Sequence, residues 1–261
     1  MNQTATASTV IVATPQAGHL RVAVVSDIHA NLHALEAVLE AIDADPPDEL
    51  WCLGDLVGYG PRPNEVVDVI RERAGLCLVG NHDLGVLGRL DLEEFSPDAA
   101  AVVRWTSTVL LDENRTLLES LEPQAKLDRA ELFHASPRDP VWEYVISEET
   151  ALAALEMTVS PLVLVGHSHV ALSVSLANGD LSGAVAPAGT EAPLDDARWL
   201  LNPGSVGQPR DGDPRAAWLE LDFEGGTARF HRVSYDIART QSELRERDLP
   251  EALAERLAHG V

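Results

Sequence analysis

Lysine is almost absent from this chain, and basic residues of any kind are scarce. The 261 residues include 19 lysines and arginines against 42 aspartates and glutamates, a formal net charge of -23, and Lys126 is the single lysine. An anionic surface repels nucleic-acid backbones and anionic membranes, so extended nucleic acid and membrane surfaces are not expected partners. A small anionic substrate would need a local positive site, which bound metal cations can supply.

Cysteine and long apolar runs are also lacking. The two cysteines, Cys52 and Cys77, lie in apolar stretches typical of buried strands and cannot form a disulfide framework, which favours a reducing cytoplasm. No apolar run approaches the ~20 residues of a membrane span. No basic segment precedes the short apolar patch near the N-terminus, so a secretory signal is not expected.

What remains is ordinary globular composition, with 45% hydrophobic and 23% charged residues. Residues 1–18 are rich in Thr, Ala and Ser without periodicity and predict a flexible N-terminal tail. Residues 19–261 predict a single domain that ends in a charged helical tail over 239–257, interrupted near Pro250.

A short apolar run, a polar turn and a helical pattern follow one another repeatedly in the first part of the chain. The predicted strands are 22–25, 50–53 and 76–79, and the predicted helices between them are 32–42 and 64–73. This order is typical of βαβ units around a largely parallel sheet.

The later part of the chain changes character. Helices are expected over 96–121, as a pair, and over 147–157, with strands at 131–134, 162–165, 216–223 and 227–235. Alternation over 170–178 and the turn signal Asn178-Gly179 indicate antiparallel sheet. The Gly-, Ala- and Pro-rich segment 183–196 is expected to be a surface excursion.

Polar side chains suited to metal binding follow five of the predicted strands. They are Asp27, His29, Asp55, Asn81, His82, His134, His167 and His169. Each one alone has an ordinary explanation as a turn residue or a hydrogen-bonded histidine. Because the ends of neighbouring strands meet at one edge of a sheet, the set as a whole favours a metal site.

These residue types suit two divalent cations that act on a phosphoryl group. Asp55 is placed to bridge the cations, and neutral imidazoles complete the ligand set without cancelling its positive charge. Asn81 offers a neutral oxygen. His82 could protonate or polarise the leaving oxygen, with Asp83 as its orienting partner.

The motifs that carry these residues are Asp27-Ile28-His29, Gly54-Asp55, Gly80-Asn81-His82-Asp83, His134 and Gly166-His167-Ser168-His169. In this order the chain resembles the calcineurin-like metallophosphoesterase superfamily, and in particular its small bacterial YfcE-like branch of phosphodiesterases and phosphatases. The resemblance implies an α/β protein: a four-layer α/β/β/α sandwich of two mixed sheets flanked by helices.

The resemblance also implies roles for the residues. Asp27, His29 and His169 would bind one ion, Asn81, His134 and His167 the other, Asp55 would bridge them, and His82 would assist the leaving group. The implied reaction is hydrolysis of a phosphodiester or phosphomonoester, including nucleotide-derived ones, by attack of a metal-bridging hydroxide. Manganese is the first candidate metal, and iron, zinc and nickel also suit these ligands.

Two positions depart from the family pattern without removing a ligand. Ala30 and Ala135 stand where glycine often follows the ligand histidine. Asn31 suits a helix cap better than a substrate contact.

Tyr59, Arg138 and Arg210 are candidate substrate contacts, although each arginine has an adjacent aspartate as an alternative partner. The alternative function is a catalytically silent metal-dependent interaction module. The edge strands and the C-terminal helix are candidate surfaces for a homo-oligomer.

Overall fold

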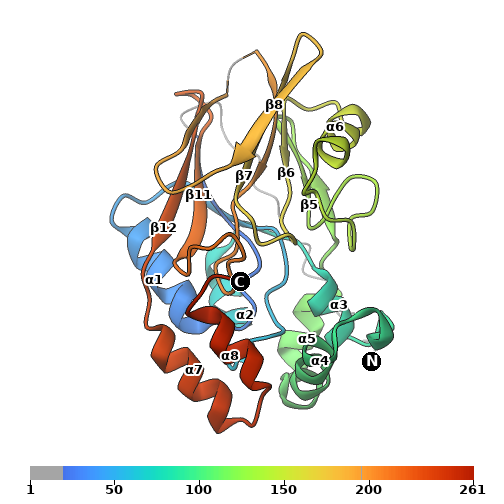
Figure 1. Cartoon of the computed structure of the whole chain (residues 1–261), viewed down its shortest axis with the longest axis vertical. Coiled ribbons are helices and arrows are strands. Elements are labelled where there is room, and N and C mark those ends of the chain that lie inside the picture. The colour runs from blue at the N-terminus through green and yellow to red at the C-terminus, as the bar shows by residue number, and fades with distance from the viewer. Residues whose placement is uncertain (1–19, 195) are drawn as a thin grey trace, which may run out of the picture.

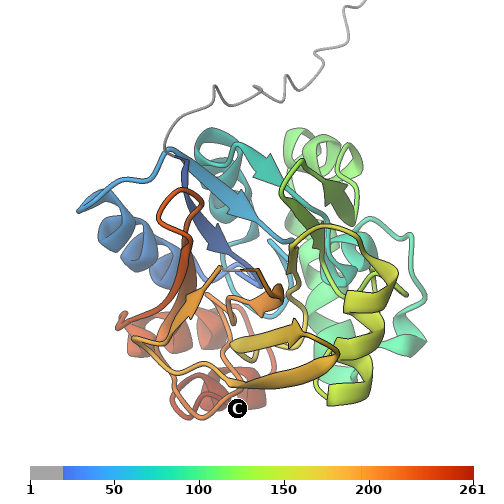
Figure 2. The same cartoon turned by 90° about the horizontal axis from the view of Figure 1, so that it is seen from above.

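Two six-stranded mixed sheets face each other at the centre of the fold, and helices cover the outer face of each (Figures 1 and 2). The computed structural model describes residues 20–194 and 196–261. The tail predicted for residues 1–18 therefore lies outside the described residues. No helix of the described ranges is both long and apolar enough to cross a membrane.

The first sheet contains the strands of the repeated strand–turn–helix units in the first part of the chain. Its strands β1, β2 and β3 are parallel, and β11, β12 and β9 continue the sheet with antiparallel pairing. In spatial order the strands are β3 (Leu76–Cys77), β2 (Glu49–Cys52), β1 (Arg21–Val25), β11 (Ala216–Asp222), β12 (Thr227–Val233) and β9 (Glu191–Pro193).

The second sheet has a parallel centre and antiparallel edges. Strands β5, β6 and β10 pair in parallel, whereas β4 pairs with β5, and β7 pairs with β10 and β8, in antiparallel fashion. The order is β4 (Gln124–Lys126), β5 (Ala130–Phe133), β6 (Leu162–Leu164), β10 (Arg198–Asn202), β7 (Leu172–Ala177) and β8 (Asp180–Val185).

Three apolar layers hold these elements together. One lies between the first sheet and helices α1 and α2, one between the two sheets, and one between the second sheet and α6. The predicted four-layer α/β/β/α sandwich is therefore confirmed. The helices are α1 (Leu32–Asp43), α2 (Pro63–Arg73), α3 (Asn81–Val86), α4 (Pro97–Val109), α5 (Asp112–Glu119), α6 (Glu148–Met157), α7 (Ile237–Glu246) and α8 (Glu251–Leu257), with a 3-10 turn at Leu92–Glu94.

Helix α1 illustrates how the sequence produces these layers. Leu35, Val38 and Ile42 recur at helical spacing and are buried against the first sheet. Asn31 begins the helix, because its side chain accepts a hydrogen bond from the backbone of Ala34. The predicted capping role of Asn31 is confirmed.

Three predictions of local structure were wrong. The segment 183–196 is not simply an excursion, because β8 and β9 both include part of it and Ala186 and Ala192 are buried. Strand β10 was missed because it follows an acidic, Ala-rich stretch, although its five residues exceed the four of β5. The turn predicted at Asn81 is instead the first turn of α3.

Candidate metal centre

The turns after β1, β2, β5 and β6 and the start of α3 converge where the two sheets meet. They bring together all eight side chains that the strand ends suggested. None of these side chains is more than 4% exposed. They are Asp27, His29, Asp55, Asn81, His82, His134, His167 and His169. A sequence pattern spread over 143 positions (27 to 169) thus becomes a single buried cluster.

Six of these residues form two groups of three. In the first trio, Asp27, His29 and His169, the Nε2 atoms of the two histidines are 3.0 Å apart, and His169 Nε2 lies 3.5 Å from Asp27 Oδ1. The second trio is Asn81, His134 and His167. His134 Nε2 lies 3.2 Å from Asn81 Oδ1, and His134 and His167 share a compact cluster with Asp55.

Asp55 lies between the two trios. Its Oδ1 accepts a hydrogen bond of 2.8 Å from the backbone of His82. Its Oδ2 is buried without a hydrogen-bond partner, 3.5 Å from His29 Nε2 and 3.6 Å from His134 Nε2. An unpartnered buried carboxylate oxygen is costly unless a cation or a donor neutralises it.

Each imidazole of the trios uses one ring nitrogen to donate to a backbone carbonyl. The pairs are His29 Nδ1 with Val57 O at 3.0 Å, His134 Nδ1 with Leu53 O at 2.9 Å, His169 Nδ1 with Gln208 O at 2.6 Å, and His167 Nε2 with Trp142 O at 3.2 Å. In a neutral ring the second nitrogen then carries a lone pair, the form that ligates metals.

The facing Nε2 atoms of His29 and His169 are therefore both acceptors and cannot hydrogen-bond to each other as neutral rings. A cation between such lone pairs would satisfy both. Together with the unpartnered Asp55 oxygen, this donor set fits divalent metal ions.

Burial sets the protonation of the cluster. It lowers the pKa of His29, His82 and His169 well below the usual range, and that of His167 to about 2, so the imidazoles are neutral at pH 7. Burial raises the pKa of Asp27 to about 7 and that of Asp55 well above its usual range. Cations bound here would favour the ionised carboxylates.

The backbone is strained at the cluster. Five of the predicted ligands have left-handed φ angles between 50° and 62°: Asp27, His29, Asp55, His167 and His169. Ala30 and Tyr59 share this conformation, which is unfavourable for residues with a Cβ atom. Strain of this kind is characteristic of functional sites.

Close backbone packing also requires glycine at two positions. A Cβ atom on Gly80 would lie 2.1 Å from Asp55 Oδ1, and one on Gly166 would lie 2.1 Å from Ser26 Oγ. Both glycines belong to the motifs that identified the site.

The structure separates His82 from its predicted partner Asp83. His82 lies in the cluster with His29 and Asp55, and its Nδ1 is buried without a hydrogen-bond partner. The carboxylate of Asp83 instead accepts hydrogen bonds of 3.0 Å from the backbone of Val57 and of Gly80. The prediction that Asp83 orients the His82 ring was wrong, because Asp83 holds the two ligand-bearing turns together.

The candidate substrate contacts have different surroundings. The Tyr59 ring lies 4.6 Å from the ring of His29 and 4.3 Å from that of His82, and the Arg210 guanidinium lies 5.5 Å from the Tyr59 ring centroid. Arg210 Nε is buried without a partner. Arg138 instead pairs with Glu143 at the surface.

Several supporting residues were not predicted. Tyr144 stacks on His167 with 4.1 Å between ring centroids, and Phe95 makes an edge contact with His82 at 5.3 Å. The carbonyl groups of Trp142 and Gln208 hold ring nitrogens. Backbone carbonyls leave no signal in residue identity, and the aromatic residues lie outside the recognised motifs.

The fold and the buried cluster define a metallophosphoesterase-type protein. The model of the calcineurin-like phosphoesterase superfamily domain matches residues 20–224, and the chain belongs to this superfamily. The superfamily prediction is therefore confirmed, while the narrower YfcE-like branch rests on the sequence motifs.

Full-length relatives support this membership. The chain is 38% identical over 244 residues to an uncharacterised protein of Methanocaldococcus jannaschii, covering 92% of this chain and 98% of that protein. The crystal structure of a metallophosphoesterase from Sphaerobacter thermophilus is 41% identical, covers 94% of this chain and 100% of its own, and has a TM-score of 0.85.

A shorter similarity concerns an enzyme with a named activity. The symmetrical bis(5'-nucleosyl)-tetraphosphatase of Photorhabdus laumondii is 32% identical over 96 residues, which are 31% of this chain and 35% of that enzyme.

Proposed function

We propose that the protein is a dinuclear metal-dependent phosphoesterase that hydrolyses a small phosphate ester. The first trio would hold one divalent cation, the second trio the other, and Asp55 would contact both. The proposal rests chiefly on one observation: the unpartnered Asp55 Oδ2 lies between His29 Nε2 and His134 Nε2, at 3.5 and 3.6 Å.

The ligand types determine the charge of the centre. Two divalent cations would supply positive charge for the phosphate oxygens and make a water molecule more acidic. Burial keeps the imidazoles of His29, His167 and His169 neutral. Asp27 and Asp55 are the carboxylates that would offset the charge of the cations, so the centre would remain cationic. In a chain of net charge -23 it would be the local attraction for an anionic substrate.

We assign His82 to the leaving group. Its buried Nδ1 has no protein partner, and its ring is close to both His29 and Asp55. Because burial keeps its pKa well below the usual range, the ring is neutral and would act by donating a hydrogen bond to the ester oxygen as the bond breaks.

We assign Arg210 to the phosphate and Tyr59 to the wall of the site. Arg210 has an unused Nε donor, and its Nη2 donates to Gln208 Oε1 at 2.9 Å beside the first trio. A guanidinium with free donors suits a phosphate oxygen. Arg138 is left out, because Glu143 already occupies its guanidinium.

The substrate class follows from the partial relative. The tetraphosphatase acts, by its name, on a dinucleoside tetraphosphate, and we propose nucleotide-derived phosphate esters as the first substrates to examine. The similarity covers 35% of that enzyme, so phosphate diesters and monoesters without a nucleoside belong in the same panel.

The test begins with protein stripped of metal and reloaded with Mn²⁺. Hydrolysis of a symmetrical dinucleoside tetraphosphate, an aryl phosphate diester and an aryl phosphate monoester is then measured. We expect turnover of at least one. Asp55→Ala should lower kcat/KM by more than about 100-fold, since outer ligand-supporting residues alone contribute about 10- to 100-fold. His82→Ala should lower kcat by about 100-fold or more.

Arg138→Ala is the control, because its exposed ion pair contributes little, and it should behave as the unmodified protein. Full activity of a folded Asp55→Ala protein would overturn the proposed mechanism. Binding of Mn²⁺ without turnover of any ester would favour the interaction module. The observation that favours the interaction module is the close burial of the cluster, in which no proposed ligand is more than 4% exposed.

A further inference from the structure

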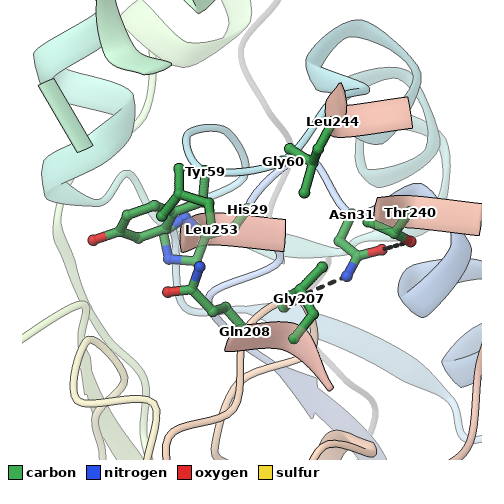
Figure 3. A pocket seen from close by; sticks show the side chains of 10 residues that line it. His29, Asn31, Tyr59, Gly60, Gly207, Gln208, Thr240, Leu244 and Leu253 are labelled. Atoms are coloured by element: carbon green, nitrogen blue, oxygen red, sulfur yellow. Dashed lines mark hydrogen bonds between the residues drawn. The ribbon is translucent and has the colours of Figure 1, made fainter. Parts of the chain in front are cut away.

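The C-terminal helices α7 and α8 pack directly over the turn that carries His29. Thr240, Leu244 and Leu253 from these helices line a cavity of about 10 Å³ together with His29 and Asn31. Figure 3 shows Thr240 hydrogen-bonded to Asn31. The superfamily match ends at residue 224, before both helices begin. Both helices therefore lie outside the segment that the superfamily model matches.

Asn31 connects the C-terminal segment to the ligand turn. Its Oδ1 accepts a hydrogen bond of 3.0 Å from Thr240 Oγ1 in α7, in addition to capping α1. Its Nδ2 donates to Gly207 O at 2.8 Å and to Tyr235 Oη at 3.2 Å. Asn31 and Thr240 are each 1% exposed, so their polar groups depend on these protein partners.

The loop reached by Asn31 supports the rest of the first trio. The amide of Gly207 and the hydroxyl of Ser205 both donate to Asp27 O, at 3.0 and 2.8 Å. Three residues beyond Ser205, the carbonyl of Gln208 accepts a hydrogen bond from His169 Nδ1. Arg256 of α8 approaches the Gln208 side chain at 3.4 Å. One network therefore links Asp27, His29 and His169 to α7 and α8.

A partly buried ion pair fixes the position of α7 in this network. Glu243 accepts hydrogen bonds of 2.6 and 2.7 Å from Arg62, and His33 Nε2 of α1 lies 2.9 Å from the same carboxylate. The amide of Arg62 donates to Ala30 O, within the His29 turn. The second trio is supported elsewhere, by the carbonyl groups of Leu53 and Trp142.

We propose that α7 and α8 position the ligands of the first ion, with Thr240 as a positioning residue, and leave the second ion unaffected. The inference rests on the proposed dinuclear centre and deepens it. A residue that acts through Asn31 should change the affinity of one ion of the two.

The test compares Mn²⁺ binding to metal-free Thr240→Val, Thr240→Ser and unmodified protein, by calorimetric titration with elemental analysis of the bound metal. Thr240→Val keeps the shape of the side chain and removes its donor. We expect about tenfold weaker binding of one ion, at the lower end of the effect of residues behind metal ligands, and unchanged binding of the other. Thr240→Ser, which restores the hydroxyl, should recover both affinities.

Thr106→Val is the matched control. Thr106 is a fully buried threonine of α4 whose hydroxyl has no hydrogen-bond partner among the described residues. It should bind both ions as the unmodified protein does, so an effect confined to Thr240 cannot reflect the loss of any buried hydroxyl.

Tyr235→Phe provides a second variant in case Thr240→Val does not fold, since it removes the other C-terminal contact of Asn31. It should weaken the same ion. Unchanged affinities in folded variants, or equal weakening of both ions, would overturn the inference. Ion binding is measured separately from hydrolysis, so an unmodified protein that binds two ions but cleaves no ester contradicts only the proposed function. An unmodified protein that binds no Mn²⁺ contradicts both.

Discussion

The two trios are assembled from different kinds of backbone. In the first trio all three residues have left-handed φ angles, 53° at Asp27, 50° at His29 and 58° at His169. In the second, His167 alone does, with φ 62°, whereas Asn81 is the first residue of α3 and His134 directly follows β5. Similar donor sets are thus presented by strained turns in one case and largely by regular elements in the other.

This difference indicates which contacts hold the left-handed backbone of the first trio in place. A left-handed residue with a Cβ atom persists only where its surroundings over-determine the conformation. The first trio has such surroundings in Asn31, the Ser205–Gln208 loop and helix α7. The second trio relies on the ends of secondary structure and on Trp142. We therefore expect the first ion to depend more on remote residues than the second does.

The largest effects should come from His169→Ala and His167→Ala, which lie two positions apart but belong to different trios. Each should weaken one ion by more than about 100-fold, because an inner ligand exceeds the 10- to 100-fold effect of its supports. The comparison becomes sharper when Thr240→Val is added to each. In His169→Ala the second ion remains, and Thr240→Val should not change its affinity. In His167→Ala the first ion remains, and Thr240→Val should weaken its binding about tenfold. Mn²⁺ titration measures both, and equal effects in the two backgrounds would contradict the division.

The pH dependence should differ between the ions. Without metal, burial raises the pKa of Asp27 to about 7, so below pH 7 a cation must displace its proton. The first ion should bind about tenfold more weakly per pH unit below 7. In the second trio the pKa of His167 is about 2, so no proton competes with a cation at His167 at this pH. Asp55, as the proposed bridge, would affect both ions alike.

Mn²⁺ titrations at pH 6, 7 and 8 measure this difference, and parallel slopes for the two ions would contradict it.

The raised pKa of Asp27 also affects the stability of the metal-free protein. Between about pH 4 and 7 the folded protein retains a proton on Asp27 that the unfolded chain releases. The contribution of Asp27 to stability therefore falls as the pH rises through this window.

The smallest effect concerns the two alanines that follow ligand histidines. Ala30 has φ 51°, whereas Ala135 does not have a left-handed φ. Ala30→Gly should stabilise the metal-free protein by about 1 kcal/mol, because glycine removes the steric cost of this conformation. Ala135→Gly should destabilise it by about 0.5–1 kcal/mol through the unfolded chain. Urea unfolding measures both, and changes of the same sign would show that strain at Ala30 is not relieved.

The sequence was sufficient to predict which side chains gather in the buried cluster, because its members share a position relative to the strands. Asp27, Asp55 and His134 each follow an apolar run, and runs of this kind could be assigned without the structure. Spatial convergence then followed from the rule that strand ends meet at one edge. The repeated order of apolar run, turn and helical pattern accounts for the correct prediction of the parallel strands β1 to β3.

Contacts decided by tertiary structure were not predictable in this way. Asp83 follows His82 in sequence, yet its carboxylate points to the backbone of Val57 and Gly80. Tyr144 reaches His167 from an irregular segment with no distinctive pattern. The role of Thr240 depends on where α7 crosses α1, and helical periodicity gives the buried face of a helix but not its partner.

The close packing at Gly166 indicates at which stage of folding the cluster can form. Gly166 lets the turn after β6 approach Ser26 and Asp27, which follow strand β1 of the other sheet. Ligands from both sheets therefore meet only after the sheets have docked, and Asp27 and His169 are far apart in the unfolded chain. Ions that recognise the completed cluster would act on the lifetime of the native state, by slowing its unfolding, rather than on the rate at which the chain first folds.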